Sequence, residues 1–293
     1  MKHMLLPLAL TFLLSAPVLG QIPNSPSPKT LVDTSRVTPD RVTPDRVGRA
    51  QAKYEELFGQ PITVSPTDPE LMTILQRFIF GEVFYIGVLD DKTRELITIT
   101  ALTTNQTLPQ LTPHTHAALN VGVTPIQIRE VVYQCAPFVG YPKVLNALEV
   151  INKVFESRGI KLPLEAMATV QEGDRLERGR QEQAPLYGDA MQQYMKVLPG
   201  EFAEAIPRML TQSGFGDFYT RRGLDLKTRE LMIFCGLATL GGTERQMASH
   251  AIGNLKVGNS KETLLAAMVQ LYPYIGFPRI SNAIHIIKDA KID

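Results

Sequence analysis

An internal duplication constrains the fold of this 293-residue chain more strongly than any other feature of its sequence. The heptapeptide DDKTREL at residues 90–96 returns as DLKTREL at residues 225–231. Farther along, the two copies stay aligned about 136 residues apart, so that His114 matches His250 and GYPKVLNA matches GFPRISNA. A match over a unit of roughly 100 residues predicts two copies of one small fold in tandem.

Both copies carry the hydrophobic spacing of helices. In residues 95–102 and again in 128–139, apolar residues recur at spacings of three and four, and no alternation of period two is sustained. Asp90 and Asp225 stand where the KTREL segments begin, which makes them candidate N-cap residues. We therefore expect an all-α fold built from two packed helical units.

A further helix start is predicted in each copy. Thr124 is followed by Pro125 and, three residues on, by Gln127, which is the pattern of a capping box. Asn259 and Glu262 repeat this pattern in the second copy. We expect one helix to begin at each of these two positions.

The first residues have the pattern of a secretory signal peptide. Lys2 precedes an apolar run, and small residues lead to a plausible cleavage site after Gly20. An uncleaved membrane anchor is the alternative, but Pro7, Ser15 and Pro17 keep the run shorter than the roughly twenty apolar residues that span a bilayer. The Pro- and Ser-rich segment that follows cannot bury enough apolar surface to offset its ordering entropy, which predicts a flexible tether.

The chain therefore divides into five expected segments. They are a signal peptide (1–20), a flexible Pro-rich tether (21–48), a first helical unit (49–158), a charged surface connection (159–186) and a second helical unit (187–293). The signal peptide predicts an exported protein, periplasmic or secreted, with no membrane span after its removal.

Charge and cysteine content narrow the classes of function. The net charge is +1, and no basic stripe with interleaved aromatic residues tracks a phosphate backbone, so nucleic acid is not an expected partner. The two cysteines, Cys135 and Cys235, both lie in apolar helical runs. Buried free thiols are one interpretation, and a disulfide in an oxidising compartment is the other.

The polar residues that recur in both copies are the candidate functional residues. Each copy places a glutamate on one expected helix and, about twenty residues later, a histidine on the next: Glu95 with His114, and Glu230 with His250. An imidazole and a carboxylate that meet in a helical hairpin form a proton-transfer pair. A structural role is the alternative, because the helix dipole alone favours a glutamate in a first turn and a histidine can be a hydrogen-bonded core residue.

A threonine and a glutamine precede each histidine by seven and four residues, so the three share one helix face. These residues are Thr107 and Gln110 in the first copy, and Thr243 and Gln246 in the second. We expect them to bind a small-molecule substrate beside the histidines.

Two further patterns carry weaker expectations. Arg94 and Arg229 stand next to the glutamates, where they could neutralise a substrate carboxylate. Adjacent helix residues point about 100° apart, however, so a surface or ion-pairing role is expected instead. Apart from His114 and His116, two residues apart, no His, Cys or carboxylate set has the spacing of metal ligands. No metal ion is therefore expected.

The first unit resembles a known family. Residues 89–159, with ALNVGVTPIQIREVV followed by GYPKVLNAL, resemble the carboxymuconolactone decarboxylase family in its gamma-carboxymuconolactone decarboxylase branch. The second unit looks like a more diverged copy. The resemblance implies an all-helical, alkylhydroperoxidase D-like fold whose single units form trimers or ring hexamers. For a tandem chain it implies a homo-oligomer, a trimer with pseudo-hexameric packing.

The same superfamily contains peroxidases that use a Cys-x-x-Cys pair, followed by a histidine after four residues. Here Thr107 and Gln110 occupy the two cysteine positions in the first copy, and Thr243 and Gln246 occupy them in the second. Neither threonine nor glutamine performs thiol–disulfide chemistry, so this peroxidase activity is not expected.

The resemblance to the decarboxylase branch implies a cofactor-free lyase. His114 is then the expected proton donor, Glu95 its orienting or proton-shuttling partner, and Gln110 a hydrogen-bond donor to the lactone oxygen. The pathway of the named decarboxylase is cytoplasmic, whereas export is predicted here, so the expected substrate is a small carboxylated lactone or a related compound. A non-catalytic, secreted binding or scaffold protein of the same fold is the alternative.

Overall fold

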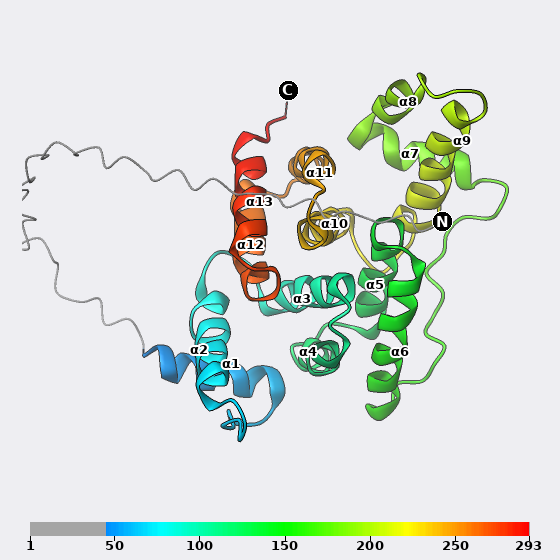
Figure 1. Ribbon diagram of the computed structural model, residues 1–293. Helices are drawn as coiled ribbons and strands as arrows, with labels where there is room; N and C mark the ends of the chain where they lie inside the picture. Colours follow the sequence, from blue (N-terminus) through cyan, green and yellow to red (C-terminus); the bar gives the residue numbers. More distant parts are fainter. Residues whose placement is uncertain (1–44, 293) are drawn as a thin grey trace, which may run out of the picture. The chain divides into compact units, whose positions relative to one another are not determined.

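The computed structural model describes residues 45–292, and all regular elements in this range are helices (Figure 1). The expected all-α fold is confirmed. The expected signal peptide and all but the end of the expected tether lie outside the described residues. No helix in the described range is both long enough and apolar enough to cross a membrane.

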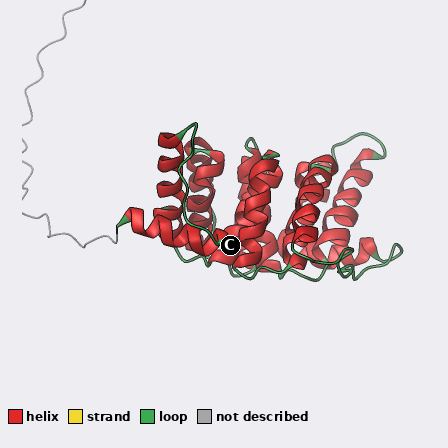
Figure 2. Ribbon diagram, turned by 90° about the horizontal axis from the view of Figure 1, so that it is seen from below, coloured by secondary structure: helices red, strands yellow, loops and turns green. Residues whose placement is uncertain are grey.

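Two helical units follow each other along the chain, and Figure 2 shows their helices joined by loops. The first unit comprises α1 (Arg46–Phe58), α2 (Pro69–Gly81), the short 3₁₀ helix η2 (Val83–Tyr85), α3 (Asp91–Asn105), α4 (Leu108–Asn120), α5 (Pro125–Val139) and α6 (Tyr141–Ser157). The second unit comprises α7 (Arg175–Tyr187), α8 (Ala190–Met195), α9 (Phe202–Met209), the π-helical segment η3 (Leu210–Tyr219), α10 (Leu226–Leu240), α11 (Glu244–Lys256), α12 (Lys261–Ile275) and α13 (Phe277–Asp289).

Three of the four expected helix starts are confirmed. The Asp90 carboxylate accepts a hydrogen bond from the backbone N–H of Thr93 at 2.8 Å, and Asp225 caps α10 in the same way. Thr124 and Gln127 form a complete capping box at the start of α5. In each case the side chain satisfies a backbone N–H that has no partner within the helix.

The fourth start was placed one residue too early. Ser260, not Asn259, caps α12, because its hydroxyl accepts from the backbone N–H of Thr263 at 3.0 Å. The Asn259 amide instead donates to the carbonyl of Lys227 at 2.9 Å, near the start of α10. Its side chain is therefore used in packing between helices.

The stretch expected to be a surface connection, 159–186, contains most of α7. This helix packs against η3 and α11, as α1 packs against α2 and α4 in the first unit. The duplicated unit therefore begins with a helix whose sequence no longer shows the match, and α7 belongs with the second unit.

The two units share one hydrophobic core. Helices α3 and α5 of the first unit pack against α10 of the second, and α12 packs against α3 (Figure 1). Ile97, Val131, Phe234 and Leu264, one from each of these helices, have no solvent exposure. Each such side chain contributes about 1.5–3 kcal/mol through burial, so the contact between the units is a core rather than a surface interface.

Two buried arginines fasten the units to each other, and the expected exposed role for Arg94 and Arg229 was wrong. Each is only 1% exposed. The Arg94 guanidinium donates to the Gln270 side chain of the second unit at 3.1 Å, and Arg229 donates to Gln134 of the first unit at 2.8 Å. The two contacts are equivalent and reciprocal.

Backbone carbonyls accept further hydrogen bonds from both guanidinium groups. Arg94 donates to the carbonyls of Val83, Ile86 and Leu89, and Arg229 donates to the carbonyl of Arg221. Burial lowers the pKa of Arg229 to about 10, which is still far above neutral. Both groups therefore stay charged, and these carbonyls replace the water that burial removes.

The two contacts differ in one hydrogen bond. The Gln270 amide donates to the Thr98 hydroxyl at 3.1 Å. At the equivalent place in the other contact, the sequence has Ile233, and Nε2 of Gln134 is buried without a partner among the described residues. The duplication thus preserved the arginine contact and let its surroundings diverge.

We predict that the same substitution has opposite effects at these two glutamines. Gln134→Glu removes an unpaired donor and gives Arg229 a charged acceptor, so the free energy of unfolding should stay unchanged or rise. Gln270→Glu loses the bond to Thr98 and should lower it by about 1–3 kcal/mol. Urea unfolding at pH 7 measures both. Equal losses would contradict the assigned difference between the two contacts.

Candidate active sites

The first candidate site joins α3 to α4. Nδ1 of His114 lies 2.9 Å from Oε2 of Glu95. Glu95 has no solvent exposure, and His114 is 7% exposed. The Asp90 cap starts α3 so that Glu95 faces inward, and the turn after α3 brings α4 back alongside it.

The hydrogen bond fixes the tautomer of His114. A carboxylate only accepts hydrogen bonds, so Nδ1 must carry the proton that it shares with Glu95. Nε2 of His114 has no hydrogen-bond partner among the described residues. It is also not fully buried, so it reaches the protein surface. This nitrogen is therefore open to a ligand, while the carboxylate holds the ring in place.

Aromatic side chains from both units surround the first pair. The rings of Phe58 and Tyr274 each lie 5.8 Å, edge to face, from the His114 ring. Phe58 ends α1, whereas Tyr274 comes from α12 of the second unit. The first site is thus completed by a residue of the other half of the chain.

Two polar atoms of this site are buried without partners. They are Oε1 of Glu95 and the hydroxyl oxygen of Tyr274. Burial raises the pKa of Tyr274, and the nearby Glu95 carboxylate raises it further. The phenol is therefore neutral and able to donate a hydrogen bond.

The second candidate site, between α10 and α11, repeats the pair but not its surroundings. Nδ1 of His250 lies 3.0 Å from Oε2 of Glu230. The Tyr187 hydroxyl donates to the same oxygen at 2.7 Å and lies 2.7 Å from Nδ1 of His250. Tyr219 donates to Oε1 of Glu230 at 2.5 Å. Both oxygens of this buried carboxylate are therefore satisfied within the protein.

Burial raises the pKa of both tyrosines of the second site, and the Glu230 carboxylate adds to the effect. Both phenols are therefore neutral donors. Phe138, from α5 of the first unit, lies 5.6 Å from the His250 ring. This contact mirrors that of Tyr274 with His114, because positions 138 and 274 are equivalent in the duplication.

A glycine makes room for one of these tyrosines. A Cβ atom at Gly253 would lie 2.5 Å from the Tyr187 hydroxyl oxygen and 2.8 Å from Oε2 of Glu230. The first unit has Ala117 at the equivalent position, and Phe58 where the second unit has Tyr187. The hydroxyl and the glycine therefore occur together in one site and are both missing from the other.

The residues expected to bind substrate lie along the same helices as the histidines. Gln110 and Gln246 are exposed, and their side chains form no hydrogen bond with a described residue. Thr107 is exposed at the start of α4. The Thr243 hydroxyl donates to the carbonyl of Leu237 at 2.7 Å and so has a structural contact.

Sequence comparison of the two copies missed the aromatic residues of both sites. Phe84 and Tyr219 end the matched segments FGEVF and FGDFY, and Phe138 and Tyr274 align as well. A change from phenylalanine to tyrosine at such aligned positions was the available signal. Tyr187 lies in α7, outside the recognisable match, and carried no such signal.

Both cysteines are buried free thiols, so the first interpretation is confirmed and the disulfide is not formed. Burial raises the pKa of Cys135 to about 12, and its thiol donates to the carbonyl of Val131. Burial also raises the pKa of Cys235. Neither thiol is ionised at neutral pH, so neither is a nucleophile there.

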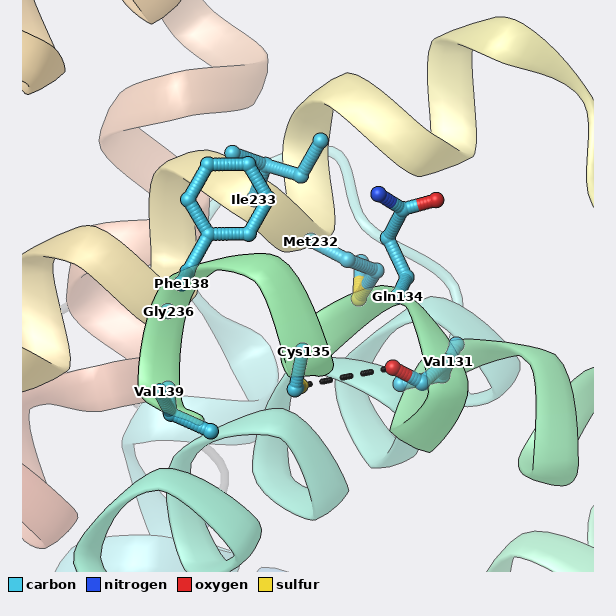
Figure 3. A pocket seen from close by; sticks show the side chains of 8 residues that line it. All are labelled: Val131, Gln134, Cys135, Phe138, Val139, Met232, Ile233 and Gly236. Carbon is cyan, nitrogen blue, oxygen red and sulfur yellow. Dashed lines mark hydrogen bonds between the residues drawn. The ribbon is translucent and has the colours of Figure 1, made fainter. Parts of the chain in front are cut away.

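A small apolar pocket lies between α5 and α10, and neither His114 nor His250 lines it, although its residue Phe138 contacts the His250 ring (Figure 3). It is lined by Val131, Gln134, Cys135, Phe138, Val139, Met232, Ile233 and Gly236. Nothing in this lining pairs a base with a nucleophile. Among residues 45–292, no three His, Cys, Asp or Glu side chains are grouped so that they could hold a metal ion.

The chain is similar to named decarboxylases. It is 31% identical to 4-carboxymuconolactone decarboxylase of Acinetobacter baylyi over 91 residues, which are 31% of this chain and 68% of that protein. It is 32% identical to nitrosuccinic acid decarboxylase of Metarhizium robertsii over 27% of this chain and 56% of that protein. It is also 40% identical to an uncharacterized 15.0 kDa protein of Paracoccus denitrificans over 30% of this chain and 66% of that protein.

The family pattern occurs twice. The Carboxymuconolactone decarboxylase family matches residues 69–153 and again residues 204–289, and the two matches together cover more than half of the chain. The first match includes Glu95 with His114, and the second includes Glu230 with His250. The chain therefore belongs to the carboxymuconolactone decarboxylase family, as a tandem duplication of its domain.

Proposed function

We propose that this protein is a decarboxylase that needs no cofactor and acts on a small carboxylated lactone or a related acid. The observation that carries the proposal is the His114–Glu95 pair. Nδ1 of His114 is hydrogen-bonded to the buried Glu95 carboxylate, and Nε2 of His114 reaches the surface. Membership of the family and two relatives named as decarboxylases support this class of reaction.

The substrate must accept an electron pair. The two relatives' named substrates, carboxymuconolactone and nitrosuccinic acid, are small acids that also carry an electron-withdrawing lactone or nitro group. When the bond to the carboxylate carbon breaks, carbon dioxide leaves and the electron pair moves into such a group. The substrate of this chain should combine the same two features.

His114 would complete the reaction by protonating carbon. The imidazolium delivers its Nε2 proton to the substrate carbanion or dienolate, and the neutral ring then takes a proton from water to restore the starting state. Glu95 keeps the ring oriented and stabilises its charged form. Gln110 is exposed one turn before His114 on α4 and would donate a hydrogen bond to a lactone oxygen.

Removal of the histidine should abolish turnover. We expect His114→Ala to lower kcat on 4-carboxymuconolactone by about 10²- to 10⁴-fold, because proton transfer by a positioned side chain contributes that much. Release of carbon dioxide by the purified protein is the measurement. His285→Ala, on the exposed face of α13, is the matched control and should leave kcat unchanged.

The alternative function has a distinct outcome in the same assay. If the wild type turns over neither this lactone nor a panel of related lactones and nitro or keto acids, the decarboxylase proposal is wrong. Should His114→Ala and His250→Ala then also melt and assemble like the wild type, a non-catalytic binding or scaffold protein becomes the better explanation.

We further propose that the protein is exported and acts as a homo-oligomer, a trimer of tandem chains. The support for export is the sequence pattern of residues 1–20, and the support for the trimer is the family resemblance. Export through the signal peptide would place the substrate outside the cytoplasm.

Export is tested by the start of the mature chain. When the full sequence is expressed in a bacterial host, mass spectrometry of the protein released from the periplasm should show a chain that begins at Gln21. Leu10→Arg interrupts the apolar run and should leave the chain uncleaved in the cytoplasm. An uncleaved wild type in the membrane fraction would instead support the anchor.

A further inference from the structure

The two sites differ in whether the protein itself satisfies the buried glutamate. In the second site, one oxygen of Glu230 accepts hydrogen bonds from Tyr187 and His250, and the other accepts one from Tyr219. In the first site, Glu95 receives His114 at one oxygen, and the other oxygen has no partner among the described residues. A buried carboxylate oxygen without a partner costs free energy.

The cause is a pair of phenylalanines. Phe58 and Phe84 stand in the first unit where Tyr187 and Tyr219 stand in the second, so the two hydroxyl groups that satisfy Glu230 are missing around Glu95. Tyr274 lies beside the first pair, and it comes from the other unit. Its hydroxyl has no hydrogen-bond partner within 3.5 Å among the described residues, although the Thr98 side chain is near enough to lower the pKa that burial raises.

A buried polar group without a partner in a native protein calls for an explanation, and a catalytic role or a bound water or ion is among the usual ones. The first site has two of them, an acceptor on Glu95 and a neutral donor on Tyr274, next to the free Nε2 of His114. The second site has none: its carboxylate and both hydroxyls are engaged with one another. The Tyr187 hydroxyl lies 2.7 Å from Nδ1 of His250, on the edge of the ring that faces Glu230.

We propose that the two sites have divided their roles. The first site binds the ligand, with the Tyr274 hydroxyl donating a hydrogen bond to a carbonyl or enolate oxygen of that ligand. The second site is a structural copy, in which Tyr187 and Tyr219 satisfy the carboxylate of Glu230. The identity of the reaction rests on the proposed decarboxylase function, whereas the division of the sites does not.

The chemistry of the first site defines the ligand class. Tyr274 is a neutral donor, so it suits an oxygen on which negative charge develops as carbon dioxide leaves. Oε1 of Glu95 accepts only, so it suits a hydroxyl of the ligand or a bound water. The rings of Phe58 and Tyr274 flank the histidine and suit a flat, conjugated molecule. A small unsaturated ring with a carbonyl oxygen meets all three conditions, and each chain should bind one.

Thermal melting tests the division without any ligand. Tyr274→Phe removes a buried hydroxyl that has no partner, so the melting temperature should stay unchanged or rise. Tyr187→Phe and Tyr219→Phe each leave Glu230 with a lost donor and should lower it by about 2–4 °C or more. Tyr272→Phe, at an exposed position of the same helix as Tyr274, is the control and should not change it.

The missing hydroxyl can also be introduced into the first site. Phe58→Tyr combined with Ala117→Gly copies the arrangement of Tyr187 and Gly253, so it supplies Glu95 with a donor. The double variant should melt higher than Ala117→Gly alone, and it should lose turnover at least about 10-fold because the new hydroxyl occupies the ligand's place.

The converse substitution, Gly253→Ala in the second site, should disturb packing. Helix propensity favours alanine over glycine by about 1 kcal/mol, yet Gly253→Ala should lower the melting temperature, because its Cβ would collide with Tyr187 and Glu230. Gly48→Ala, exposed in α1 with its nearest contact at 3.5 Å, is the control and should not lower it.

Turnover of 4-carboxymuconolactone tests the role of Tyr274. Tyr274→Phe should lower kcat by about 10²-fold with little change in KM, since its donor acts on charge that develops in the transition state. Tyr272→Phe should keep the wild-type kcat. A Tyr274→Phe variant with wild-type kcat would overturn the assignment.

The two proposals fail in different ways. If Tyr274→Phe destabilises the protein as much as Tyr187→Phe does, its hydroxyl has a structural partner and the division of the sites is wrong, whether or not the wild type is active. If the wild type is inactive but the melting difference is present, the reaction is wrong and the division is supported.

Discussion

The rest of the structure depends on two buried arginines that each bind a glutamine of the other unit. Arg94 donates to Gln270 and Arg229 donates to Gln134, and backbone carbonyls accept further hydrogen bonds from both guanidinium groups. A charged group that is 1% exposed cannot lose these partners without a large penalty. The contact therefore fixes α5 and α12 across the boundary between the units, and with them the aromatic residues that these helices carry.

Because α5 and α12 each contact the opposite unit, neither site is built from one unit alone. The arginine and the glutamate are neighbours in sequence, so the segment that locks the units also supplies the carboxylate of each site. Four residues beyond Gln134 and Gln270, the same helices place Phe138 and Tyr274 against the opposite histidines. The repeated heptapeptide thus supplies a helix cap, a contact between the units and the carboxylate that pairs with the histidine.

The sequence allowed the helical fold, the duplication and the two His–Glu pairs to be predicted, because these follow from local spacing and from residues that both copies share. It misjudged Arg94, since a charged residue beside a capped helix start is usually exposed, and only tertiary contacts reveal its carbonyl partners. It missed Tyr187 because α7 lies outside the recognisable repeat. The Tyr274 hydroxyl lacks a hydrogen-bond partner because of the tertiary packing around it, and no sequence pattern encodes that packing.

Duplication within one chain removes the requirement that two equal sites change together. In an oligomer of identical single units, a phenylalanine that becomes tyrosine appears in every site at once. Here one unit has Tyr187 beside Gly253, whereas the other has Phe58 and Ala117 at the equivalent positions. The hydroxyl that satisfies Glu230 stabilises the second unit, and its absence leaves Glu95 available to another molecule. One unit could therefore gain stability without closing the site of its neighbour.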